Sequence, residues 1–518
     1  MADILSLLSG PAEARHWQRS GMASCCRLAC AALAQGRSSV ILVRDREEYT
    51  AARALLTLFS PSLSLADMAP DVPAWKLPFA ALPAGLLLRR DRDSWAGRLA
   101  ALYGLAQGGP RCLILSTEAL LLRHVPRDFF AEHTLDLTRG SDYPPELILD
   151  QAVEWGYERV PLVTRPGQMA RRGDIFDIFP SGYPRPVRME FFGDTLEELR
   201  LFDAESQRSL QGLDELTLLP ALPFVLDAQG LAAARKRMDA LFAGARISEN
   251  DCYTFKKTLD AGGLGLLPGV VHEKASTIAD WLPEEPLWFL PGQADCDAAL
   301  HGTAMQLRDQ LEEDDAPLPQ PSALCLCGSL QDLPWEKARR FYLEPLVMGV
   351  DAVGDDVQER PLHAFTDLFP VPGAADRPWQ HLSAGLKEWQ NRRRQVVLSF
   401  SSQRSRAKFL KLAEQEGITP ALRYAPEQRG LFALVSPWRS GAELVWDDVL
   451  VLGEDILYPR AEKKARASSR AFKGLDSFDD LKAGDLLVHR DYGIGRFAGL
   501  HHLVQGGQGN DFLLVEYS

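Results

Sequence analysis

The sequence has 518 residues, 8 cysteines and a formal net charge of −13. Because single domains usually hold about 100–200 residues, this length predicts several domains, and the acidic balance excludes a protein that wraps nucleic acid over its whole surface. The sequence has no apolar run long enough to cross a membrane, no basic start typical of a secretory signal and no regular cysteine framework, which together favour a cytoplasmic protein without membrane contact.

Residues 1–122 alternate β-branched runs with helical segments. The stretch 38–59 predicts a buried strand followed by an amphipathic helix, and the stretch 111–123 predicts another strand and helix. Because strands that alternate with helices form parallel sheets, we expect an α/β domain here.

The next part of the chain, residues 123–212, is different. Several short strand-like runs are divided by Gly and Pro, which predicts a small inserted α+β domain. Residues 213–345 contain helical segments at 231–246 and 301–314 and are expected to return to the first domain, since the two ends of an inserted domain often lie close together.

Residues 362–456 predict a second α/β domain without an assignable task. Its expected strands lie in 394–400, 431–437 and 447–455, and the first two are joined by a helix. The polar stretch 457–476 predicts a flexible linker. Residues 477–518 predict strands of a small β-barrel, and we expect the chain to stop before that barrel closes.

Motifs that carry catalysis are missing from the sequence. A phosphate-binding loop needs G-x-x-x-x-G-K-[S/T], and the segment before the first predicted helix, 9–26, has no Gly-Lys pair. G-x-S-x-G, H-E-x-x-H and C-x-x-C do not occur either. The sequence therefore predicts no catalytic residue, no metal site and no cofactor in this chain.

Two motifs resemble known families. Residues 170–210 carry R-G-D followed by R-M-E-F-F-G-D and then F-D-A-E-S-Q-R-S, which is similar to the segment shared by the repair protein UvrB and the transcription-repair coupling factors, the Mfd family. Residues 481–500, "LKAGDLLVHRDYGIGRFAGL", resemble the polymerase-interacting domain of that family, a fold also met in CarD-type regulators. The order of the two motifs resembles the amino-terminal part of the Mfd family.

The resemblance implies two docking surfaces. The UvrA-binding residues of the family match Arg172, Arg188 and Phe192, and the surface for the RNA polymerase β subunit would include Arg496 and Leu503. Arg has a rigid donor fork and an exposed Phe is an effective anchor, so the residue types suit these roles.

Structural roles for the same residues stay open. Arg172 and Arg188 could pair with Asp174 and Glu190 inside the sheet, and Leu503 could belong to a barrel core. Phe192 could also be a core residue, but alternation along a strand places Phe191 and Phe192 on opposite faces, so we expect one to be buried and the other exposed.

The resemblance also implies a fold and a function. The first domain would be a degenerate P-loop, RecA-like (UvrB-like) fold, and the last a partial Tudor/SH3-like barrel. The chain would be a non-enzymatic docking fragment that recruits UvrA to stalled RNA polymerase, without activation because the domain that masks the UvrA surface is not in this sequence. ATP, Mg and double-stranded DNA would bind a motor outside it. A UvrB-like ATP-dependent helicase and a CarD-like transcription regulator are the alternatives.

Overall fold

The computed structural model divides the chain into two compact units, residues 1–459 and 460–518. The structure describes residues 8, 13–60, 73–76, 79–82, 92–108, 111–225, 227–242, 253, 257, 268–272, 274–282, 285–313, 338–345, 355–363, 365–368, 378–392, 394–457, 486–489, 493–505 and 508–516. Among these residues, none of the helices combines the length and apolar character that crossing a membrane requires.

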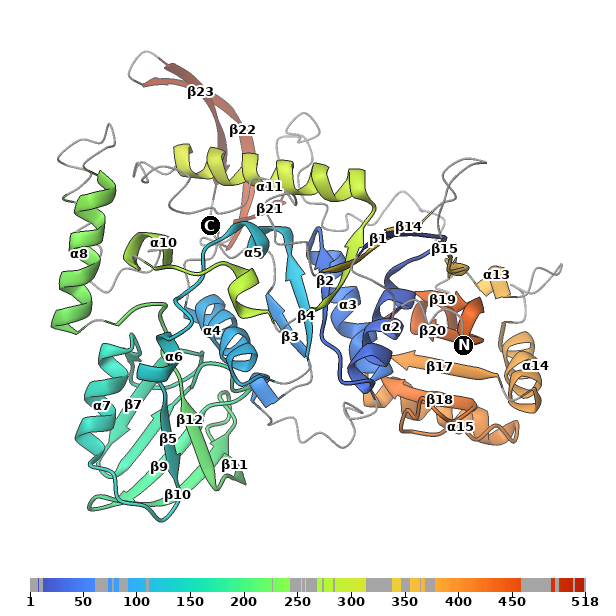
Figure 1. Cartoon of the computed structure of the whole chain (residues 1–518), viewed down its shortest axis with the longest axis horizontal. Helices are drawn as coiled ribbons and strands as arrows, with labels where there is room; N and C mark the ends of the chain where they lie inside the picture. Colours follow the sequence, from blue (N-terminus) through green and yellow to red (C-terminus); the bar gives the residue numbers. More distant parts are fainter. Residues whose placement is uncertain are drawn as a thin grey trace. The chain divides into compact units, whose positions relative to one another are not determined.

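A seven-stranded parallel sheet forms the first part of the first unit (Figure 1). Its order is β15-β1-β14-β13-β2-β4-β3. The strands are β1 (Ala14–Gln18), β2 (Ser39–Val43), β3 (Phe79–Leu82), β4 (Cys112–Ser116), β13 (Leu287–Pro291), β14 (Arg339–Glu344) and β15 (Asp355–Asp356). The parallel sheet and the positions of β2 and β4 confirm the α/β prediction. Strands β13 and β14 lie between β1 and β2, so the segment after the insertion completes this sheet.

Helices cover both faces of this sheet because β2 is apolar on both sides. Ile41 and Val43 pack with helices α2 and α3, whereas Val40 and Leu42 pack with α4 and α5 on the other face. The helices of this part are α2 (Met22–Ala34), α3 (Arg46–Phe59), η2 (Ala74–Lys76), α4 (Arg92–Ala106), α5 (Thr117–Leu121), α8 (Ala228–Phe242), α10 (Pro268–Val271), η3 (Ile278–Trp281) and α11 (Gln293–Glu313).

The inserted region is rich in strands. A six-stranded sheet has the order β11-β10-β9-β8-β7-β6, and β5 pairs with β12 in a separate ribbon. The elements are α6 (Phe129–Glu132), β5 (Leu135–Thr138), α7 (Pro145–Glu154), β6 (Glu158–Arg159), β7 (Gln168–Arg172), β8 (Ile175–Ile178), β9 (Val187–Phe192), β10 (Thr195–Phe202), β11 (Ser209–Gly212) and β12 (Glu215–Leu218).

Two Gly-Asp pairs fix the hairpins of this sheet. Arg172 pairs with Ile175 across one turn, and Phe192 pairs with Thr195 across the other, so each loop has two residues. Gly173 and Gly193, the first residue of each loop, both have a φ of 63°. This left-handed conformation favours glycine and suits the right-handed twist of the two strands.

A second, mixed sheet has the order β16-β19-β20-β17-β18. Its strands are β16 (Glu359–Leu362), β17 (Gln395–Phe400), β18 (Gly430–Val435), β19 (Gly441–Leu444) and β20 (Val449–Gly453), and its helices are α13 (Phe365–Leu368), α14 (Pro378–Asn391), α15 (Gln403–Gln415), η6 (Val445–Asp447) and α16 (Glu454–Leu457). The strands β17, β18 and β20 and the helix α15 lie where the sequence predicts them. The antiparallel strands β16 and β19 are not predicted.

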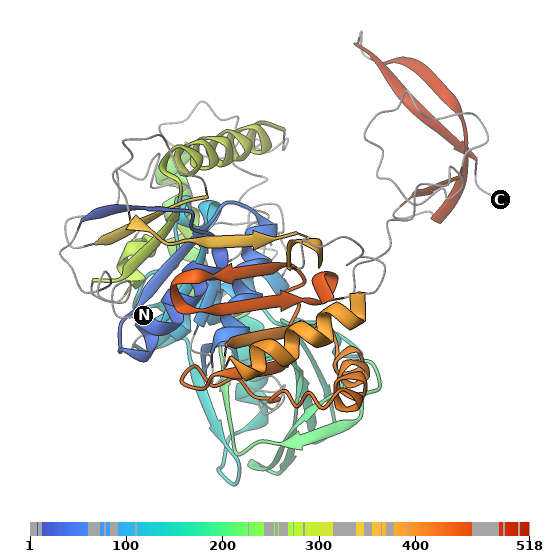
Figure 2. The same ribbon diagram turned by 90° about the vertical axis from the view of Figure 1, so that its right-hand side faces the viewer.

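Helices α2 and α3 pack between the two sheets. One hydrophobic cluster contains Ala29 and Leu55 of these helices, Ile41 of the first sheet, and Val397 and Val451 of the second. Helices α14 and α15 cover the opposite face of the second sheet (Figure 2). The two sheets and the helices between them therefore share one core.

The second unit contains a three-stranded antiparallel sheet of β21 (Leu486–His489), β22 (Gly493–Gln505) and β23 (Gln508–Glu516). The predicted linker 457–476 lies outside the described residues except for Leu457, a buried residue at the end of α16.

Candidate protein-docking face

Strand register brings the three predicted docking residues to one face of the six-stranded sheet. Arg172 lies opposite Ile175, which lies opposite Glu190, and Asp177 lies opposite Arg188. Since residues in register share a face and side chains alternate along a strand, these residues form a single face. We call it the outer face and define it by Arg172, Ile175, Asp177, Arg188, Glu190, Phe192, Glu198 and Arg200. The opposite face packs on α7.

Phe192 is the most exposed large apolar residue of the outer face. Its exposed fraction is 77%, whereas its neighbour Phe191 is 6% exposed and lies in the core. The expected alternation of the two rings is confirmed, and Phe192 is not a core residue. An exposed ring beside charged side chains can anchor a partner protein, because burying it removes a large apolar area from water.

Arg188 is held by a carboxylate that lies next to it in the sheet. Its Nε and Nη2 donate to the two oxygens of Asp177 at 2.7 and 2.9 Å, and its guanidinium lies 4.7 Å from the ring centre of Phe202. The hydrogen bonds to Asp177 raise the pKa of Arg188 above its ordinary value. The open alternative, a pair between Arg188 and Glu190, is not seen, because Glu190 accepts a hydrogen bond from Arg200 at 2.5 Å.

Arg172 lies at the edge of the outer face and is exposed. Its Nη2 donates to the carbonyl oxygen of Pro161, so the side chain fixes the loop before β7 and is not paired with Asp174 in this structure. The next residue of that loop, Leu162, is 43% exposed, and Ile175 across the hairpin is 37% exposed. Leu162 and Ile175 are thus further exposed apolar side chains of the segments that flank Arg172.

The outer face has the chemistry of a binding surface. An exposed apolar ring, a smaller apolar side chain and arginines can recognise a partner by burial and charge. Within the described ranges, no group of three or more His, Cys, Asp or Glu side chains could hold a metal ion. Sequence reasoning missed Asp177 and Ile175, although both lie in the same R-G-D-I-F-D motif as Arg172.

Two protein families match the chain. The UvrB interaction domain matches residues 135–224, which include the whole outer face, and the CarD-like/TRCF RID domain matches residues 481–518. The transcription-repair-coupling factor of Myxococcus xanthus is 28% identical over 459 residues, which cover 83% of this chain and 38% of that protein. The corresponding protein of Escherichia coli K12 is 25% identical and is covered over 38% of its length.

The chain is similar to the amino-terminal portion of the transcription-repair-coupling factors. The factor of Mycobacterium tuberculosis aligns with 100% of the chain at 25% identity, and 42% of that protein is covered. The chain thus spans about two fifths of the length of the curated relatives that it matches. The resemblance predicted from the two motifs is confirmed.

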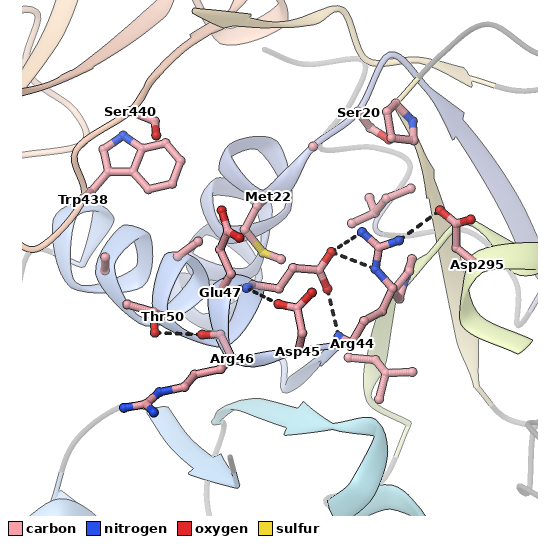
Figure 3. A pocket seen from close by; sticks show the side chains of 18 of the residues that line it. Ser20, Met22, Arg44, Asp45, Arg46, Glu47, Thr50, Asp295, Trp438 and Ser440 are labelled. Atoms are coloured by element: carbon pink, nitrogen blue, oxygen red, sulfur yellow. Dashed lines mark hydrogen bonds and ion pairs between the residues drawn. The ribbon is translucent and has the colours of Figure 1, made fainter. Parts of the chain in front are cut away.

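A second candidate site in this coupling-factor region is a cavity of about 1000 Å³ beside the first sheet. Its lining includes Ser20 after β1, Arg44 after β2 and Gly292 after β13, so it lies outside the carboxyl ends of these strands. Parallel α/β sheets commonly bind ligands at this edge. Figure 3 shows that Trp438 and Ser440, which follow β18, border the same cavity.

The charged groups of this cavity do not form a phosphate site. The side chain of Asp45 caps α3 by accepting a hydrogen bond from the backbone N–H of Glu48, and Glu47 adds another carboxylate at the same helix end. Arg44 donates to Glu48 at 2.8 Å and to Asp295 at 3.1 Å (Figure 3). Carboxylates at a helix amino terminus compete with a bound anion, so this end of α3 is unfavourable for phosphate.

The second unit places its candidate residues on β22. Arg496 is exposed, and in register it lies between Leu486 of β21 and Glu516 of β23. Leu503 pairs with Asn510, and its side chain lies outside the described part of the structure. Both predicted residues are therefore on one strand of the sheet that belongs to the CarD-like/TRCF RID match.

Proposed function

We propose that this chain is a docking module for transcription-coupled repair, which recruits UvrA through the outer face and contacts the RNA polymerase β subunit through β22. The main support for the UvrA contact is the ring of Phe192, which is 77% exposed on a sheet that matches the UvrB interaction domain. ATP-driven movement and most contact with double-stranded DNA are proposed for a motor outside this sequence, since the chain spans only part of the length of its relatives.

The roles of the two arginines differ in this proposal. Arg172 offers N–H groups at the exposed rim of the outer face, so it contacts UvrA directly. The guanidinium of Arg188 is hydrogen-bonded to Asp177 and lies over the ring of Phe202, so Arg188 mainly positions the strand that carries Phe192. Residues acting in this way contribute to binding through the geometry of the face.

The finer fold and domain assignments also remain proposals. We take the first parallel sheet as a degenerate P-loop, RecA-like domain and β21–β23 as part of a Tudor/SH3-like barrel. The predicted limits 1–122, 123–212, 213–345, 362–456 and 477–518 serve as working boundaries. Support comes from the strand order of the first sheet and from the CarD-like/TRCF RID match. In this proposal Arg496 contacts polymerase through its exposed side chain, whereas Leu503 lies on the part of β22 that is in register with β23 and beyond the pairing with β21. A strand edge of that kind can pair with a strand of a partner, a frequent mode of protein recognition.

Calorimetric titration of purified UvrA with this chain tests the docking proposal. We expect Phe192→Ala to weaken binding at least about tenfold, which corresponds to about 1.4 kcal/mol. The fold should be unaffected, because the ring is largely in water. Leu147→Ala is the matched control, since Leu147 is 65% exposed on α7, a helix that packs against the other face of the sheet.

Either of two results would contradict the docking proposal. The first is a folded wild-type chain that does not bind UvrA, and the second is equal binding by wild type and Phe192→Ala. The helicase alternative predicts ATP binding by this chain, and no phosphate-loop motif in the sequence supports it. A CarD-like regulator would bind polymerase and leave UvrA unbound, so the same titration separates it from the proposal.

A further inference from the structure

A carboxylate of the second sheet lies at the amino terminus of helix α2. Strand β1 ends at Gln18, and α2 begins at Met22 after a short loop. The Oε2 atom of Glu359, the first residue of β16, accepts hydrogen bonds from the backbone N–H groups of Gly21 at 2.9 Å and Ser24 at 2.8 Å. In nucleotide-binding α/β folds, the free N–H groups at such a strand–helix junction hold phosphate.

Gly21 leaves room for this carboxylate. A Cβ atom at Gly21 would lie 2.5 Å from Glu359 Oε1 and 2.9 Å from its Cδ. The backbone of Gly21 is extended, with a φ of −144°, so its conformation would accept other residues. A side chain at this position would therefore require the Glu359 carboxylate to move away from the helix terminus.

Two further contacts attach the same helix to the second sheet. Arg27 Nε donates to Asp447 Oδ2 at 2.7 Å, and both side chains are almost fully buried. Trp446 Nε1 donates to the hydroxyl oxygen of Ser24 at 3.2 Å. Removing one partner of such a buried ion pair strongly destabilises the folded protein, because the other charge then remains unpaired in the core. Helix α2 is thus fixed by the second sheet at its first and second turns.

A carboxylate also lies at a strand–helix junction of the second sheet, where the side chain of Ser402 caps the helix by accepting from the backbone N–H of Ser405. Strand β17 leads through Ser401 and Ser402 into α15, and the carboxylate of Glu454 accepts from the backbone N–H of Ser401 at 3.0 Å. The hydroxyl groups of Ser401 and Ser405 also donate to Glu454. Burial raises the pKa of Glu454, but these hydrogen bonds outweigh burial and leave it below its ordinary value.

We propose that Glu359 is an internal replacement for phosphate: it closes the nucleotide position of the first sheet and joins that sheet to the second. Glu454 lies at the comparable junction of the second sheet, where it accepts from Ser401 and Ser405. The connection is short, because β15 pairs with β1 and β16 begins three residues later in the other sheet. The body formed by both sheets is therefore a scaffold whose geometry does not depend on nucleotide. This inference is independent of which partners the chain binds.

Thermal unfolding of the full chain in phosphate and in chloride of equal ionic strength tests the replacement. Phosphate should raise the unfolding temperature of wild type only by the general stabilising effect that this salt has on folded proteins. Glu359→Ala should unfold at a lower temperature in chloride, and phosphate should stabilise it more than it stabilises wild type, because the freed N–H groups bind the anion. Glu359→Gln, which keeps the shape and one acceptor oxygen, should lie between them. Glu414→Ala, the loss of an exposed carboxylate on α15, is the control for charge.

Two outcomes would overturn the inference. One is a wild-type chain that phosphate or ATP stabilises as much as Glu359→Ala. The other is a Glu359→Ala chain with wild-type stability and no phosphate effect. If Glu359→Ala does not fold, Glu359→Gln provides the second test, because it keeps the size of the side chain and removes its charge. A Glu359→Gln chain with wild-type stability and no additional phosphate effect would contradict the proposed role of the carboxylate.

Discussion

Arg188 illustrates how a residue can belong to a docking motif and still be structural. Arg188 donates two hydrogen bonds to Asp177, at 2.7 and 2.9 Å, and the side chain of Asp177 is only 4% exposed. Removing the arginine leaves this carboxylate without its cation in a place where water reaches it poorly. Loss of UvrA binding in an Arg188 variant would therefore not by itself identify a contact.

We expect Arg188→Ala to lower the free energy of unfolding by roughly 3 kcal/mol, because it leaves Asp177 unpaired. Urea denaturation followed by circular dichroism measures this change. Arg172→Ala is the matched control, since Arg172 is exposed and makes one backbone contact, and it should change the free energy of unfolding by less than about 1 kcal/mol. Equal stabilities of the two variants would contradict the structural role of Arg188.

At the scale of elements, short motifs fix the hairpins whereas distant residues fix the helices. The two Gly-Asp turns determine the register of β7 with β8 and of β9 with β10, since each loop has two residues. Helix α2, in contrast, receives its amino-terminal acceptor from Glu359, which is 338 positions away in the sequence. Local sequence could predict the first arrangement and not the second.

His124 joins several elements and should make stability depend on pH. It is fully buried, its Nδ1 lies 3.1 Å from Nη2 of Arg98 on α4, and its Nε2 lies 3.0 Å from the carbonyl oxygen of Ala119 on α5. Since Arg98 can only donate, Nδ1 accepts and Nε2–H donates to Ala119. Burial, and then the charge of Arg98, lower the pKa of His124 well below its ordinary value.

The sign of the pH effect follows from this lowered pKa. Below pH about 6.5 the unfolded chain binds a proton at His124 that the folded chain does not, so the free energy of unfolding falls by up to about 1.4 kcal/mol per pH unit. The stabilising contribution is complete above pH about 6.5 and is lost as the pH falls toward the folded pKa. In urea denaturation between pH 7.5 and 5, the free energy of unfolding of His124→Gln should depend less steeply on pH than that of wild type. His363→Gln, a change at an exposed histidine, should keep the wild-type dependence. Identical slopes for wild type and His124→Gln would contradict this assignment.

At the scale of the whole molecule, continuous cores join the parts of the first unit. One hydrophobic cluster contains Val40 of the first sheet and Met189 of the six-stranded sheet. Another contains Ile41 of the first sheet and Val397 of the second. Because both clusters include β2, loss of the first sheet exposes apolar surface on the other two.

We therefore expect the described part of residues 1–459 to unfold as one cooperative body. Hydrogen exchange in increasing urea should show that the amides of β2, β9 and β17 lose protection at the same urea concentration. The amides of β22, in the second unit, provide an internal comparison, since they belong to a separate compact unit. Loss of protection in β17 at clearly lower urea than in β2 would show that the second sheet is an independent domain.

The sequence by itself determined the features that depend on near neighbours. Alternating strands and helices predicted the parallel sheet and the second α/β region, Gly and Pro divided the strand-like runs of the insertion, and strand alternation separated Phe191 from Phe192. The missing G-K-[S/T] excluded a phosphate loop. These features could be predicted because periodicity and turn conformation are set by a few adjacent residues.

Only the tertiary structure decided which distant segments meet. It placed β13 and β14 between β1 and β2, paired Arg188 with Asp177 instead of Glu190, and brought Glu359 to the amino terminus of α2. Each of these contacts is selected by the burial of apolar faces over long sequence separations and by the need to give every buried charge a partner. No local pattern contains that information, because many partners are equally compatible with the same strand or helix until the whole core is packed.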